Sequence, residues 1–318
     1  MACRLRVAAA RAQVTARGLA QGACAGLALI GAISEAQAGS PPLLGLTLGV
    51  GAQYDSNVVI DDADSSRRNG DGGLLTTGTL SFAPVQTRKT NVRVAYSFDG
   101  VTNFKLTDVN LAIHGGSLAL SRRMGKVTFG LDYQLNHIVL GSRPYLDVHL
   151  VSPSLALFVK PRLYVRGAYS YQSKNFTSAN RLDARTSLVS LDAYRFFAKR
   201  KGYIALGVRG DDERASGPEF TYRAIQGSAR VQIPLRIFGT DAKARASVTY
   251  SDRSYTNETR SIGARRSEQR STISAGIDLP LGKRMTLRPL YRFVDRRSNI
   301  PVFNYRAHFA STMLVVKF

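Results

Sequence analysis

The chain has 318 residues, with 44 lysines and arginines against 22 aspartates and glutamates, which gives a formal net charge of +22. The only cysteines are Cys3 and Cys24, so the rest of the chain cannot hold a disulfide framework. No basic helix, zinc-finger spacing or aromatic RNA-binding motif is present, which argues against nucleic acid as the partner. The positive surplus is instead expected to attract anionic solutes, acidic glycolipid or acidic proteins.

Residues 1–38 read as a secretory signal peptide. Four arginines precede the apolar run GLALIGAI, and the small-x-small pattern AQA ends at Ala38. The apolar run is shorter than the roughly 18 residues that a transmembrane helix needs. Gln21 stands where a lipoprotein signal before Cys24 would need a bulky aliphatic residue. Export is therefore predicted, with residues 39–318 as one mature domain.

Beyond residue 40, apolar and polar residues alternate with a period of two. In KVTFGLDYQL (126–135), Phe129, Leu131 and Tyr133 share one face, and Thr128 and Asp132 share the other. Such alternation is typical of a half-solvated antiparallel sheet, and taken alone it fits a sandwich, a soluble barrel or a membrane barrel. No long segment in this region has a convincing helical period.

Fourteen strands are predicted, and the fourth, sixth and eighth have the least regular alternation. Their ranges are 43–54, 74–85, 91–103, 109–121, 126–138, 146–159, 162–173, 184–197, 202–212, 219–235, 241–253, 268–280, 284–295 and 303–318. Connections after odd-numbered strands are long and polar, such as 56–73 and 254–270, whereas those after even-numbered strands are short, such as 160–162. Outer-membrane barrels combine short periplasmic turns with longer outer loops, and an even strand number returns both ends to the periplasm. The sequence therefore predicts an all-β, antiparallel up-and-down barrel in the bacterial outer membrane.

The last segment, ASTMLVVKF (310–318), is predicted to be the strand that closes the barrel. Ala310, Thr312, Leu314, Val316 and Phe318 share one face, which is expected to contact lipid while the strand closes the barrel. A terminal aromatic residue on such a strand looks like the signal that barrel-insertion machinery reads. Phe318 is therefore a predicted assembly signal, and that machinery is a predicted partner.

Basic residues with apolar neighbours are expected on the inner face, because an outward charge would cost about 2–4 kcal/mol near the bilayer midplane. They are Arg93, Arg166, Arg209, Arg230, Lys243, Arg245, Arg288 and Arg292. One interpretation is a conduit that attracts anions or the acidic surface of a passing protein. The other is a set of internal ion pairs with Asp99, Asp132 and Asp278 that stabilise the barrel.

Further charged residues are expected in the outer loops. Basic residues there are expected to contact lipopolysaccharide phosphates: Arg253, Arg260, Arg265, Arg266, Arg270, Arg296 and Arg297. The first loop holds Asp55, Asp61, Asp62, Asp64 and Asp71, without the ligand spacing of a calcium loop. The histidines His114, His137, His149 and His308 are scattered and lie in no nucleophile motif. No metal, cofactor or enzymatic activity is therefore predicted.

Two stretches at opposite ends of the mature chain are more specific. GVGAQYDSNV (49–58) ends the first strand with Tyr54, Asp55, Ser56 and Asn57, and RSNIPVFNYRAHFASTMLVVKF (297–318) contains Ser298, Asn299, Ile300, Pro301 and Tyr305. Together they resemble the two ends of the C-terminal β-barrel of surface lipoprotein assembly modifiers. In that family a fourteen-stranded barrel, usually preceded by a periplasmic tetratricopeptide domain, helps to deliver lipoproteins to the bacterial surface.

The resemblance implies a barrel that assists translocation of proteins or lipoproteins. No segment of this sequence reads as the tetratricopeptide module, so surface lipoproteins and a separate periplasmic tetratricopeptide protein are the implied partners. A passive anion-preferring porin and an exporter of acidic polysaccharide are the alternatives. Composition does not separate the three, because each of them needs a basic lumen.

Overall fold

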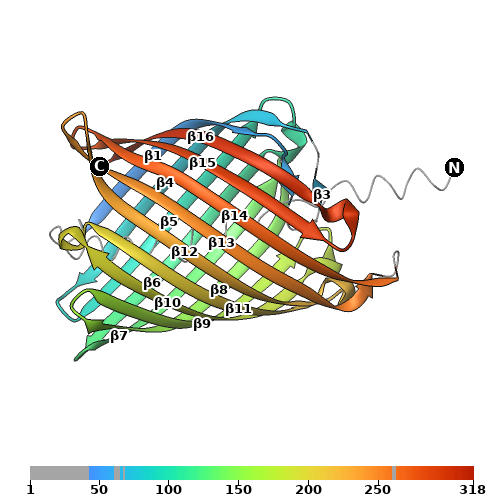
Figure 1. Ribbon diagram of the computed structural model, residues 1–318, viewed down its shortest axis with the longest axis horizontal. Helices are drawn as coiled ribbons and strands as arrows, with labels where there is room; N and C mark the ends of the chain where they lie inside the picture. Colours follow the sequence, from blue (N-terminus) through green and yellow to red (C-terminus); the bar gives the residue numbers. More distant parts are fainter. Residues whose placement is uncertain (1–42, 61–64, 67–68, 260–262) are drawn as a thin grey trace.

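The computed structural model describes residues 43–60, 65–66, 69–259 and 263–318. Within them, fourteen strands form one closed antiparallel barrel in which sequence neighbours pair and β16 pairs with β1 (Figure 1). They are β1 (Leu44–Asp55), β4 (Asp71–Gln86), β5 (Thr90–Asn103), β6 (Leu111–Met124), β7 (Val127–Leu140), β8 (Arg143–Lys160), β9 (Leu163–Phe176), β10 (Ala184–Phe197), β11 (Gly202–Ala215), β12 (Tyr222–Ile237), β13 (Thr240–Thr259), β14 (Ala264–Leu281), β15 (Met285–Ser298) and β16 (Tyr305–Lys317). The predicted fold class and strand number are confirmed.

The remaining elements are small. β2 (Val59–Ile60) and β3 (Ser65–Ser66) form a separate two-stranded ribbon, and short 3₁₀ turns lie in the connections at η2 (Thr107–Val109), η3 (Asn180–Leu182), η4 (Ala198–Arg200), η5 (Pro218–Phe220) and η6 (Pro301–Phe303). None of the helical turns in the described ranges is long and apolar enough to cross a membrane. The predicted signal peptide lies outside these ranges.

The alternation along each strand sorts side chains between the two faces of the barrel wall. On β7, Phe129, Leu131 and Tyr133 are exposed on the outer face. Asp132 lies between them and reaches Arg166 on β9, past the intervening strand β8, which requires both side chains to lie on the inner face. A closed ladder with an apolar outer face is the arrangement that hydrocarbon demands of a membrane-spanning sheet.

The connections differ in length between the two ends of the barrel. At one end all six are short, namely 87–89, 125–126, 161–162, 198–201, 238–239 and 282–284. At the other end, 56–70, 104–110, 177–183, 216–221 and 299–304 are longer. The connection at 141–142 is a two-residue turn with positive φ at Gly141 and Ser142, so the expectation of a long loop after every odd strand is wrong there.

The expectation of an outer loop at 254–270 is also wrong. β13 and β14 continue through most of it, and their register extends to Thr259 opposite Ala264, with an irregularity between Ser254 and Glu258. The polar sequence of this segment is typical of a loop. Beyond the bilayer, however, both faces of a strand can be polar, and the ladder needs only a neighbouring strand to continue.

The barrel closes where β1 meets β16. Nine opposing residue pairs join them, from Thr47–Lys317 to Asp55–Phe309. The backbone N–H of Phe318 donates to the carbonyl of Leu46 at 2.9 Å, and the Phe318 ring is 61% exposed. This junction is called the seam below.

Candidate functional site

Ion pairs on the inner face connect strands that are not neighbours, and two of them lie in the middle part of the wall. Arg166 Nη2 on β9 lies 3.5 Å from Asp132 Oδ2 on β7. Arg230 Nη2 on β12 donates to Asp192 Oδ1 on β10 at 2.5 Å. Each pair spans an intervening strand, so it restrains the curvature of the wall as well as neutralising charge.

A second group of contacts lies on β11 and β13 to β15. Asp278 accepts from Arg245 Nη2 at 2.5 Å and lies 3.3 Å from Arg288 Nε, so one carboxylate serves two arginines. Arg209 Nη2 donates to Asp211 two residues along the same strand at 2.8 Å. Asp192 and Asp211 were not predicted as partners. Asp192 lies between Leu191 and Ala193, so alternation could have placed it on the inner face, whereas Asp211 lies between Gly210 and Asp212 and shows no such pattern.

The other predicted inner-face residues have different surroundings. The Arg292 guanidinium lies 4.6 Å from the centre of the Phe309 ring. Lys243 opposes Asp278 in the β13–β14 register, and Arg93 opposes Ala119 in the β5–β6 register. Asp99 forms no ion pair with any residue that the structure describes. The ion-pair interpretation thus applies to at least five of the eight basic residues, Arg166, Arg209, Arg230, Arg245 and Arg288. A substrate path along the eight stays a prediction.

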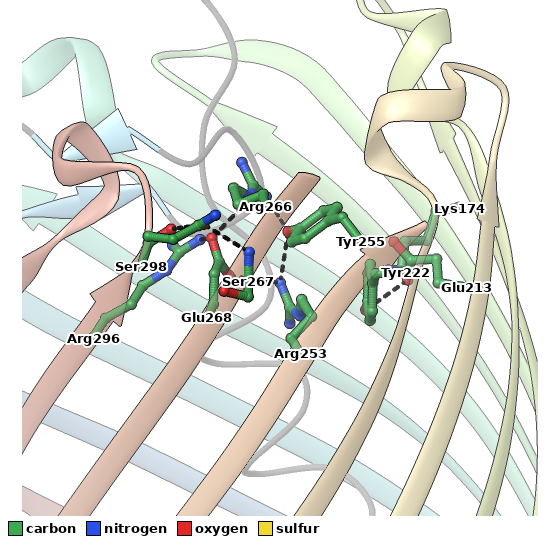
Figure 2. Close-up of polar contacts among 11 residues, drawn as sticks. Lys174, Glu213, Tyr222, Arg253, Tyr255, Arg266, Ser267, Glu268, Arg296 and Ser298 are labelled. Carbon is green, nitrogen blue, oxygen red and sulfur yellow. Dashed lines mark hydrogen bonds and ion pairs between the residues drawn. The ribbon is translucent and has the colours of Figure 1, made fainter. Parts of the chain in front are cut away.

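Nearer the end with the longer connections, a buried polar network crosses β9 to β12 (Figure 2). Glu213 Oε2 accepts from Lys174 Nζ at 2.5 Å, from Thr186 Oγ1 at 2.9 Å and from the Tyr222 hydroxyl at 3.0 Å. The lysine and glutamate side chains are almost fully buried. Burial is tolerable because the charges are paired and the carboxylate has further donors.

The network continues to β15 around a single carboxylate, that of Glu268. Arg296 Nη2 lies 2.6 Å and Arg266 Nε 3.0 Å from Glu268 Oε1, and Arg253 Nη1 lies 3.7 Å from Oε2. The Arg266, Glu268 and Arg296 side chains are only 4–5% exposed. Figure 2 shows these side chains projecting toward one another from neighbouring strands. The name arginine cluster is used below for Arg253, Arg266, Arg296 and Glu268.

Aromatic rings fill the space between these guanidinium groups. Arg266 lies 3.8 Å from the Tyr255 ring centre and 4.3 Å from that of Phe303, and it also donates to the Tyr255 hydroxyl. Arg253 lies 4.2 Å from the Tyr222 ring centre. Cation–π contacts of this kind gain strength when they are shielded from water.

The arginine cluster corrects the expectation that these arginines lie in outer loops. Arg253, Arg266 and Arg296 occupy strands and face the interior, because β13 to β15 run further than their polar sequence suggested. Arg265 and Arg297 are exposed, but they too lie on strands, β14 and β15, rather than in loops. Arg270 is half-buried on β14, and Arg260 lies outside the described residues.

The aspartates and histidines have structural contacts. Asp71 accepts from the backbone N–H groups of Lys105 and Leu106 at 2.8 and 2.7 Å, and Asp61, Asp62 and Asp64 lie outside the described ranges. Tyrosine hydroxyls contact the Nδ1 atoms of three histidines at 2.8–2.9 Å, in the pairs Tyr96–His114, Tyr133–His149 and Tyr291–His308, while His137 contacts Asp147. No group of three metal-ligating side chains occurs in the part of the chain that the structure describes.

The two family-like motifs meet at the seam. Ser56 Oγ accepts from the His308 N–H at 2.8 Å, Ser56 N–H donates to the His308 carbonyl at 2.9 Å, and Asn57 Nδ2 donates to the Arg306 carbonyl at 3.3 Å. Asp55 Oδ1 in turn accepts from the Asn57 N–H at 3.0 Å, and the Tyr54 side chain is exposed. The first motif therefore extends the β1–β16 contact beyond the ladder itself.

The second motif builds the connection that leads into β16. Asn299 bridges to β14, because its Oδ1 accepts from the Ser267 N–H and its Nδ2 donates to the Arg265 carbonyl, both at 2.8 Å. Ser298 Oγ accepts from the Ile300 N–H at 3.2 Å. Ile300 is buried, Pro301 begins η6, and Tyr305 is buried at the start of β16.

An apolar cluster covers the inner face at the loop end of β6 to β9. It contains Val109, Leu111, Ile113, Ile138, Leu140, Tyr145, Leu146, Val148, Phe176, Ala179 and Leu182, with Val58, Val101, Leu106 and Phe220 packed against it. The connections holding η2, η3 and η5 thus fold onto the wall. This apolar cap was not predicted, although the irregular alternation of the fourth and sixth predicted strands was its signal.

No protein-family profile and no curated protein matches this chain. Solved structures do share its fold. OmpT of Vibrio cholerae with loop L8 deleted has a TM-score of 0.52 at 7% identity, covering 86% of this chain and 99% of its own. An anion-selective porin from Comamonas acidovorans reaches 0.53 at 8%, and a bacterial polysaccharide outer membrane secretin 0.50 at 9%, each covering 86% of this chain and 98% of its own. At these identities the likeness concerns the fold alone, and the chain has the fold of an outer-membrane β-barrel.

Proposed function

We propose that this barrel is a channel that conducts anions across the outer membrane. The observation that carries the proposal is the shortage of carboxylates on the inner face. Asp278 alone meets two arginines, and Glu268 alone meets three. A lumen lined by one sign of charge concentrates mobile ions of the opposite sign.

The purified barrel is expected to conduct ions in planar bilayers. Under a salt gradient, the sign of its reversal potential is expected to show a preference for chloride over potassium. Replacing both arginines at Asp278, as Arg245→Gln with Arg288→Gln, should move the permeability ratio of chloride to potassium toward one, because Asp278 then stands without its guanidinium partners. Arg143→Gln with Arg265→Gln is the matched control, since both side chains are exposed at the opposite end. Cation selectivity or absence of conductance in the unsubstituted protein would contradict the proposal.

A second candidate function is translocation of proteins or lipoproteins in the manner of surface lipoprotein assembly modifiers. The meeting of Ser56 and Asn57 with β16 supports it, because a client strand could pair with an edge exposed by opening the seam. The partners would be surface lipoproteins and a separate periplasmic tetratricopeptide protein.

A disulfide across the seam tests this candidate. Gln53 and Ser311 oppose each other in the β1–β16 register, so Gln53→Cys with Ser311→Cys places two thiols on facing strands. Oxidation should abolish surface exposure of lipoprotein clients, reduction should restore it, and ion conductance should not change. Surface exposure that is indifferent to oxidation would remove the support for a lateral opening.

An exporter of acidic polysaccharide would use the same basic lining. We also propose outer-membrane lipid as the partner of the outer surface, with lipopolysaccharide phosphates at Arg265, Arg297 and Arg306, which are exposed. Barrel-insertion machinery is the proposed reader of Phe318. Both proposals rest on the outer-membrane fold and on side-chain chemistry.

A further inference from the structure

Six short turns and the C-terminus lie at the same end of the barrel (Figure 1), and the sequence there is rich in basic residues. Counted over the turns with three residues on either side and over the last residues of β16, they number fifteen, and all are exposed. They are Arg88, Lys89, Arg122, Arg123, Lys126, Lys160, Arg162, Arg195, Lys199, Arg200, Lys201, Arg236, Lys283, Arg284 and Lys317. Among the described residues of this zone, Asp241 is the one acidic side chain. We call these fifteen residues the basic rim.

The opposite end of the barrel has mixed charge. Ion pairs there neutralise exposed arginines, as in Arg181–Glu219, Arg223–Asp212 and Arg297–Asp295. On the basic rim, the ion pair between described residues is that of Lys201 with Asp241, at 3.4 Å. The barrel is therefore electrostatically polar along its axis, with its positive end at the short turns.

The strand register shows that residues of the basic rim lie on both faces of the barrel wall, and therefore also at the opening of the barrel. Arg123 opposes Thr128 on the inner face, Arg236 shares its face with Arg230, and Lys317 opposes Thr47. Arg122 and Arg195 occupy outer-face positions, opposite Phe129 and Ile204. A surface made for lipid headgroups would favour the outer face, so this distribution indicates a partner at the opening.

The positive charge continues into the barrel. On β13, Lys243 and Arg245 follow the rim along the inner face, and on β15 Arg288 lies four residues beyond Arg284. Farther along the inner face is Arg230, whose side chain is partly exposed. A ligand with a single charge would need only one of these positions, whereas a chain of regularly spaced charges can contact many at once, and such contacts reinforce one another.

We propose that the basic rim is a loading site for a soluble linear polyanion of the polyuronate type, which enters the barrel from the periplasm. The proposal rests on the anion channel proposed above and adds its substrate class and direction. Short turns of outer-membrane barrels face the periplasm. The field at this mouth therefore draws anionic chains from the side on which an exported polymer is delivered.

The test compares two quadruple variants of equal charge change. Arg88→Gln, Lys89→Gln, Lys283→Gln and Arg284→Gln remove rim charges whose side chains contact no described partner. The control Lys105→Gln, Arg143→Gln, Arg185→Gln and Arg214→Gln removes exposed charges at the other end, and Asp212, the partner of Arg214, keeps Arg223. In detergent at low salt, the rim variant should bind sodium polygalacturonate about tenfold more weakly than the unsubstituted protein. The control should bind as the unsubstituted protein does, and added salt should reduce the difference.

Equal loss of binding in both variants, or no loss in either, would overturn the loading site, because net charge or another surface would then explain it. A second measurement compares the thermal stability of the variants in nanodiscs that contain phosphatidylglycerol. If this lipid no longer stabilises the rim variant alone, while polygalacturonate binding is intact, the basic rim binds lipid and the loading site is overturned. The salt-gradient measurement separates this proposal from the channel itself. Chloride selectivity together with equal polygalacturonate binding in every variant would support the anion channel and contradict the loading site at the basic rim.

Discussion

Replacing Glu268 with glutamine is expected to lower the free energy of unfolding by about 3–5 kcal/mol, the range for breaking a buried ion pair from one side. Its carboxylate is the group that Arg253, Arg266 and Arg296 share, at 3.7, 3.0 and 2.6 Å. Glutamine keeps the shape and one acceptor oxygen but removes the charge. Three guanidinium groups are then held close together on strands whose backbone ladder prevents them from separating.

The measurement is unfolding in denaturant, followed by the heat-dependent gel mobility that folded barrels show. Glu258→Gln is the control, because Glu258 lies on the same hairpin but is exposed, so its loss should change stability by less than about 0.5 kcal/mol. Equal and small effects of the two substitutions would show that the arginines have enough other acceptors, and the central role assigned to Glu268 would be wrong.

Replacing Ile138 with alanine is expected to cost about 2–5 kcal/mol, because it opens a cavity in the apolar cap. Ile138 has no exposed surface and lies on β7 where η2 and the start of β8 pack against the wall. Its neighbours are carried by the backbone of a closed barrel, so they cannot collapse into the space. The cap should loosen before the barrel ladder does.

Thermal unfolding and proteolysis of the connection at 104–110 report these two events separately. Val302→Ala is the matched control, since Val302 lies in η6 and is exposed, and its truncation should leave both readouts unchanged. An Ile138 variant with unchanged melting temperature and unchanged protease resistance would mean that the cap contributes nothing to the mouth.

The sequence predicted those features that depend on a strict period of two. Phe129, Leu131 and Tyr133 against Asp132 fix the outer and inner faces of β7, and the same argument applied to every strand predicts the barrel and its strand number. The argument fails where side chains on both faces are alike. Polar residues on β13 and β14 resembled a loop, and apolar residues such as Leu111 and Ile113 blurred the alternation because they face the cap.

The partners of the inner arginines could be predicted less well, for a geometric reason. Arg166 meets Asp132 and Arg230 meets Asp192 across an intervening strand, so each contact depends on strand stagger and barrel curvature. Alternation places each residue on a face but does not give its height in the barrel. Glu213 and Glu268 were not predicted for the same reason. A single acidic residue in a polar stretch does not indicate that three donors surround Glu213, or that three arginines surround Glu268.

The seam has a consequence for how the chain reaches its native state. Asn57 meets the carbonyl of Arg306 over a sequence separation of 249 residues, and Phe318 donates to Leu46. Contacts between such distant residues carry the largest loop-closure entropy, and they form slowly. Until the last strand arrives, β1 remains an unpaired edge that can join other chains. The stage before the barrel closes is therefore the one at which this protein is most prone to aggregate, and it ends only when residues 305–318 are in place.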